Sequence, residues 1–131
     1  MADRALFIGF GVPVRGREER AIEVFNEFVE LLGRMQSDGR IASMDVSLLD
    51  PHGGELGGFF MAYGSEAQCA ALPNDEEFRR ATIDASLIVE NFGVVPAVTG
   101  EAVGREMAMY SDAVKKVGHG AHALAGAHDS G

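Results

Sequence analysis

Bulky hydrophobic residues alternate with small ones at the start of the chain, and apolar residues recur at helical spacing farther on. The alternation over residues 4–14 predicts a strand with one bulky face and one lean face. A helix is predicted from Glu18 to the stop signal Ser37-Asp38-Gly39, where glycine suits a left-handed cap. Two more strands are predicted over residues 41–49 and 56–63, with a glycine-containing turn between them.

Two helices are predicted next, and each begins at a capping box. Ser65 and Gln68 have the spacing that starts a short helix. Asn74 and Glu77 repeat this spacing, and an apolar stripe continues from there at helical intervals as far as Phe92. The second of these helices is therefore predicted to be a long one that ends at Phe92.

The end of the chain predicts a short strand over residues 94–99 and a last helix over residues 101–117. Pro96 has no N–H for a sheet ladder, so the short strand is expected at a sheet edge. Residues 118–131 are rich in glycine, alanine and histidine and are predicted to form a flexible tail. The last helix carries an apolar stripe, formed by Val103, Met107, Tyr110 and Val114.

The order of elements is β-α-β-β-α-β with one more helix after it. This order predicts a single ferredoxin-like α+β domain over residues 1–117, with a four-stranded antiparallel sheet and helices on one face. Phe7 and at least one of Phe59, Phe60 or Tyr63 should lie on the other face. Monomers rarely tolerate an apolar patch of that size, so two copies are expected to pair through their open sheet faces.

The element order, the helix interruption at residues 72–78 and the segment at residues 91–96 resemble members of the dimeric α/β-barrel superfamily. The resemblance covers roughly residues 6–117 and implies ferredoxin-like subunits that pair sheet to sheet. The superfamily includes cofactor-free monooxygenases, lactone isomerases, dehalogenating or dehydrating enzymes, haem-dependent chlorite-degrading enzymes and ligand-sensing domains. The resemblance therefore implies a fold and a homodimer rather than one activity.

Charge and cysteine content narrow the class of partner. The net charge of −9 disfavours nucleic acid and anionic membrane surfaces, since both attract basic proteins. Cys69 is the only cysteine, so no internal disulfide can form and a reducing cytoplasm is the expected compartment. The chain enters its first strand at once, and neither a secretory signal nor a membrane span is expected there.

Three residues are candidates for chemistry. Asp45 is expected on the open sheet face, where a second copy would desolvate it and make it a general acid or base. His52 in the glycine turn and Tyr63 at a strand end could orient a substrate or move a proton. Each also has a structural reading: a solvated carboxylate, an exposed turn residue, and a core tyrosine with a wet tip.

No metal or cofactor site is predicted. Three histidines in the tail are loosely spaced, and a metal site needs a fixed geometry that this segment is not expected to provide. These histidines are His119, His122 and His128.

Two functions remain open. In one, a cytoplasmic homodimer binds or transforms a small, partly apolar molecule without a cofactor, in a cleft between the sheet and the helices. In the other, the dimer is a non-catalytic binding, sensing or scaffold module whose open sheet face serves for association.

Overall fold

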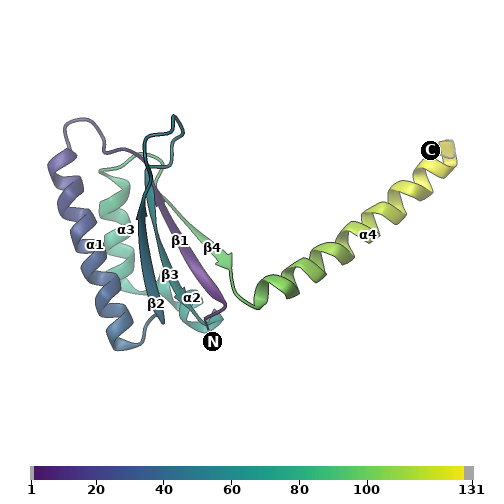
Figure 1. Cartoon of the computed structure of the whole chain (residues 1–131), viewed down its shortest axis with the longest axis horizontal. Coiled ribbons are helices and arrows are strands. Elements are labelled where there is room, and N and C mark those ends of the chain that lie inside the picture. Colours follow the sequence, from purple (N-terminus) through teal and green to yellow (C-terminus); the bar gives the residue numbers. More distant parts are fainter. Residues whose placement is uncertain (1, 129–131) are drawn as a thin grey trace.

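A four-stranded sheet is covered on one side by two helices, and a last helix leaves the domain (Figure 1). The computed structural model describes residues 2–128, with side chains as far as Gly118. A one-turn 3-10 helix, Leu72–Asn74, joins α2 to α3. The other elements, in chain order, are β1 Arg4–Phe10, α1 Glu18–Asp38, β2 Ser43–Leu48, β3 Gly58–Gly64, α2 Glu66–Ala71, α3 Glu76–Ser86, β4 Gly93–Val98 and α4 Ala102–His128.

The sheet has the strand order β2-β3-β1-β4, and every neighbouring pair is antiparallel. The predicted ferredoxin-like α+β fold is confirmed. β4 lies at an edge, as Pro96 predicts, because this residue has no N–H to donate to a further strand. Figure 1 shows α1 and α3 on one side of the sheet and α4 on the other.

Strand register divides the side chains of the sheet between two faces. Ile8 pairs with Phe60, and both are buried beneath the helices, on what we call the covered face. Phe7 pairs with Met61, and by the alternation of a strand these side chains lie on the opposite face. This open face consists of Ala5, Phe7, Gly9, Ser43, Asp45, Ser47, Phe59, Met61, Tyr63, Gly93, Val95 and Ala97.

The hydrophobic core lies between the covered face and helices α1 and α3. Phe28 of α1 stacks on Phe60 with ring centroids 5.1 Å apart and meets Phe78 of α3 edge-on at 6.0 Å. Leu32 and Met35 follow one and two turns later on the same side of α1 and are fully buried. The apolar stripe predicted for this helix is therefore its core-facing side.

The prediction that the second long helix reaches Phe92 is wrong, because α3 ends at Ser86. Past its end, the N–H of Val14 donates to the carbonyl of Ile88 at 2.8 Å, and further backbone hydrogen bonds join the same two segments. These bonds satisfy the backbone in place of another helical turn. β1 is likewise shorter than predicted and ends at Phe10.

Capping explains where α2 and α3 begin. The predicted capping box of Ser65 and Gln68 is confirmed at the start of α2. The box predicted at Asn74 is wrong, since this residue belongs to the 3-10 helix. Asp75 caps α3 instead, and its side chain accepts a hydrogen bond of 3.0 Å from the N–H of Phe78.

α4 begins after a short connection from β4 and continues to His128, beyond the end predicted at residue 117. The side chains of residues 119–131 lie outside the described part of the chain. The flexible tail over residues 118–131 therefore stays a prediction.

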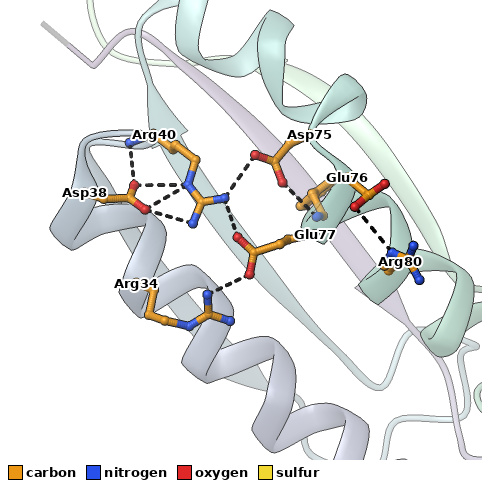
Figure 2. A network of polar contacts seen from close by, with 8 residues as sticks. Arg34, Asp38, Arg40, Asp75, Glu76, Glu77 and Arg80 are labelled. Atoms are coloured by element: carbon orange, nitrogen blue, oxygen red, sulfur yellow. Dashed lines mark hydrogen bonds and ion pairs between the residues drawn. The ribbon is translucent and has the colours of Figure 1, made fainter.

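Ion pairs join the end of α1 to the start of α3 (Figure 2). The guanidinium of Arg40 lies 2.8 Å from Asp38, 3.0 Å from Asp75 and 2.9 Å from Glu77. Arg34 adds a contact of 2.7 Å to Glu77. Two arginines thus hold three carboxylates together where the two covering helices meet.

These contacts change the pKa values of the acids. The hydrogen bond from Arg40 lowers the pKa of Asp38, and hydrogen bonds from Arg34 and Arg40 lower the pKa of Glu77. Burial alone would raise the pKa of Asp75, but hydrogen bonds from the start of α3 and from Arg40 outweigh it and lower the pKa. The resulting stability is present above the unfolded-state pKa of about 4 and is lost as the pH falls through the lowered folded-state values.

The substitution Arg40→Met is therefore expected to lower the melting temperature at pH 7 by on the order of a few degrees. It leaves three carboxylates facing one another without their shared cation. The difference from the unmodified protein should narrow between pH 5 and pH 3, as the acids become protonated. Thermal unfolding followed by circular dichroism at several pH values measures this.

The matched control is Arg80→Met, because Arg80 reaches only Glu76, at 3.8 Å, with both side chains exposed. Such a pair contributes little, so this variant should unfold like the unmodified protein at every pH. A deficit of Arg40→Met that stays constant with pH would contradict the electrostatic explanation.

Candidate functional site

An apolar cleft lies between α1, the segment after α3 and the covered face of the sheet. Its volume is about 280 Å³. Ala21 and Ala85, from the two helices, line it with short side chains and leave space between the larger residues. Its remaining lining residues are Phe10, Gly11, Pro13, Ile22, Val24, Phe25, Phe28, Leu48, Phe60, Ile88, Val89 and Phe92.

Aromatic rings from three elements form one side of this cleft. The ring centroid of Phe60 in β3 lies 5.4 Å from that of Phe25 in α1 and 5.8 Å from that of Phe10 at the end of β1. Phe10 and Phe25 meet edge-on at 6.2 Å. The sequence predicted a cleft between the sheet and the helices, but not which residues line it.

Gly11 brings two backbone segments together beside the cleft. A Cβ atom at this position would lie 2.7 Å from the carbonyl oxygen of Glu90 and 2.9 Å from that of Glu55. The backbone segments around Glu55 and Glu90 therefore approach the chain closely at Gly11. Only a residue without a side chain fits here.

The rim of the cleft is exposed, whereas its interior is not. Ile22 on α1 and Leu48 at the end of β2 are 64% and 69% exposed, and the lining residues Phe28 and Phe60 are buried. None of the lining residues ionises at neutral pH. The cleft can therefore take up an apolar molecule by desolvation, and its walls supply no acid or base.

Asp45 and Tyr63 lie near each other on the open face. Asp45 pairs with Met61, and Ser43 pairs with Tyr63, so the carboxylate and the phenol are diagonal neighbours on adjacent strands. Burial raises the pKa of Tyr63, and the carboxylate of Asp45 adds to this effect. Asp45 itself is exposed in the single chain.

His52 belongs to the loop between β2 and β3 and does not join this pair. Its Nδ1 accepts a hydrogen bond of 3.1 Å from the N–H of Gly54, so its Nε2 carries the proton and donates to the carbonyl of Leu56 at 2.7 Å. Asp45 lies three residues before Leu48, where β2 ends, which places it about 10 Å from the start of the loop. The exposed ring of His52 therefore makes both of these hydrogen bonds within its own loop.

The sheet separates the two features. The cleft lies on the covered face, whereas Asp45 and Tyr63 lie on the open face. One chain therefore does not bring the predicted polar residues into the apolar cleft. Because Asp45 is exposed, the described part of the chain leaves the polar pair open to water.

Two other predictions concern sulfur and metal. Cys69 is buried, and burial raises the pKa of its thiol, which makes it a poor nucleophile. Within the part of the chain that the structure describes, no three side chains of His, Cys, Asp or Glu gather as a metal site requires. The tail histidines His119, His122 and His128 lie outside the residues with described side chains.

No helix among the described residues is both long and apolar enough to span a bilayer. No protein-family model and no curated protein matches this chain.

Two solved structures are similar to the chain. One is a dimeric protein of unknown function with a ferredoxin-like fold from Bacteroides fragilis, with a TM-score of 0.54 and 14% identity over 72% of this chain and 95% of that one. The other, from Chloroflexus aurantiacus, is provisionally named an antibiotic biosynthesis monooxygenase. It has a TM-score of 0.49 and 13% identity over 74% of this chain and 93% of that one. The likeness to the Bacteroides fragilis protein shows the fold, and the resemblance to ferredoxin-like subunits is confirmed at that level.

Proposed function

We propose that this protein is a homodimer that binds a small apolar molecule, without a cofactor, in the cleft between α1 and the covered face. The observation that carries the proposal is the cleft of about 280 Å³ with its aromatic wall. Small-molecule sites commonly have volumes of roughly 300–1,000 Å³, so this one suits a compact ligand of two or three rings. Flat rings would stack on Phe10, Phe25 and Phe60.

The open face supports the homodimer. Phe7 and Phe59 lie there with ring centroids 5.0 Å apart, and Met61 and Val95 flank Phe7 in its row of the sheet. A second copy with the same face would remove this apolar surface from water. The similar protein from Bacteroides fragilis is itself dimeric.

The cleft is tested with the fluorescent probe N-phenyl-1-naphthylamine, which brightens in apolar surroundings. The buried Ala85 lines the cleft, so Ala85→Phe should fill it and weaken probe binding at least tenfold. Ile83, two residues earlier on the exposed side of α3, provides the matched control Ile83→Phe. The control should bind the probe as the unmodified protein does.

A second variant covers the case in which Ala85→Phe strains the core. Ile22 is exposed at the rim, so Ile22→Asp places a charge at the entrance without disturbing packing. It should also weaken binding, since an apolar ligand cannot solvate the carboxylate. Equal probe affinity in the unmodified protein, Ala85→Phe and Ile22→Asp would exclude the cleft as the binding site.

A second candidate function rests on the Asp45 and Tyr63 pair. In a dimer closed over the open face, Asp45 would act as a general base and Tyr63 would orient the substrate. The observation that favours it is their proximity together with the raised pKa of Tyr63. This function requires enclosure, so it falls if a charge placed on the open face by Phe7→Glu leaves the dimer intact.

A further inference from the structure

α4 leaves the domain in a fixed direction but has an uncovered apolar side. Ala102 in its first turn is buried, and Arg105 forms an ion pair of 3.0 Å with Asp3. These contacts attach the start of the helix to the domain. The helix then extends away on the side of the sheet that α1 and α3 leave open (Figure 1).

Five of the large apolar residues of α4 form one straight seam. They are spaced alternately four and three residues apart, which is the spacing of helices that pack along their length. All five are between 44% and 70% exposed. We call this set the α4 seam: Val103, Met107, Tyr110, Val114 and Val117.

The residues beside the seam suit close packing. Small residues flank it, namely Gly104, Ser111 and Ala113, and they would let another surface approach the helix. Glu106 also borders the seam, whereas the other charged residues, Arg105, Asp112, Lys115 and Lys116, lie farther around the helix. A helix that stands alone in water is only marginally stable. A helix with this pattern is therefore stabilised by packing its apolar side.

We propose that α4 is an arm that packs its seam against the second copy of this chain, the same copy that covers the open face. The inference rests on the proposed homodimer and adds a second contact to it. α4 follows the edge strand β4 directly and projects on the open side, so a copy docked on the open face lies beside it. The seam and the open face then form one continuous interface.

Area supports a joint interface. Each partner in a stable complex contributes roughly 800 Å², and five half-exposed apolar side chains supply on the order of half of that. The open face, with Phe7, Met61 and Val95 at its centre, supplies the remainder.

The arm adds no net charge to the contact. Residues 2–100 carry sixteen carboxylates and eight arginines, so two domains repel each other. Over residues 101–117, Arg105, Lys115 and Lys116 balance Glu101, Glu106 and Asp112. A neutral arm can therefore pack against the acidic partner domain without adding to that repulsion.

The test compares Met107→Glu, within the seam, with Met109→Glu, outside it. Both methionines are exposed, at 57% and 59%. Methionine and the glutamate that replaces it both form helices well. Sedimentation equilibrium of the full chain gives the dimer dissociation constant. Met107→Glu should raise it at least tenfold, and Met109→Glu should leave it within twofold of the unmodified value.

Hydrogen exchange of α4 provides a second readout. Its amides should exchange more slowly at concentrations where the dimer forms than after dilution to monomer. If the protein dimerises but Met107→Glu matches Met109→Glu, or α4 exchange does not depend on concentration, the arm is refuted and the homodimer stands. A protein that stays monomeric at all concentrations refutes the homodimer and the arm together.

Discussion

Replacing Phe60 by alanine is expected to lower the free energy of unfolding by about 3–5 kcal/mol, the usual cost of deleting a buried aromatic side chain. Phe60 is 3% exposed and lies at the centre of the core. Its ring contacts Phe10, Phe25 and Phe28 at centroid distances of 5.8, 5.4 and 5.1 Å. Removing it takes away both the burial and three ring contacts, and it enlarges the cleft.

Urea unfolding measures this loss, with Phe60→Leu as the matched control. Leucine keeps most of the apolar volume and should cost less than about 1.5 kcal/mol. If Phe60→Ala loses no more unfolding free energy than the small loss expected for Phe60→Leu, the aromatic cluster is not a tightly packed core.

Placing a charge at the centre of the open face is expected to separate the dimer. Phe7 lies in the middle row of this face, paired with Met61 on one side and Val95 on the other. In Phe7→Glu, the interface would have to bury a carboxylate without a partner, beside its symmetry copy. We expect the dimer dissociation constant to rise at least a hundredfold in sedimentation experiments, with the circular dichroism spectrum retained.

The control for this experiment is Ile83→Glu. Ile83 is exposed on α3, behind the covered face, and is apolar like Phe7. Its substitution should leave association unchanged. A dimer that tolerates Phe7→Glu would exclude the open face as the interface, and the catalytic proposal for Asp45 and Tyr63 would fall with it.

Local signals predicted most of the fold. The alternation in β1, the left-handed cap at Gly39 (φ 87°) and the capping box at Ser65 each depend on a few adjacent residues. The end of α3 was missed because Ile88 and Phe92 continue its helical spacing, whereas the observed end depends on backbone bonds to a segment about 75 residues earlier. Spacing along the chain carries no information about such a partner.

The candidate site was predictable only in part. Alternation in β2 correctly placed Asp45 on the open face, and register then showed that Tyr63 is its neighbour. A cleft between the sheet and the helices was expected, but its lining residues could not be predicted, because aromatic residues that fill a core and those that line a gap share one periodicity. The available signal was composition: the chain has eight phenylalanines and no tryptophan, and five of these phenylalanines line the cleft.

The strand order has a consequence for how the protein is made. β1 is synthesised before its two neighbours in the sheet, β3 and β4. One of its edges can pair only after β3 has been made, from residue 58, and the other only after β4 has been made, from residue 93. During translation this hydrophobic strand has no complete sheet to join, and contacts so distant in sequence form slowly. Nascent chains should therefore depend on chaperones until β4 has emerged from the ribosome.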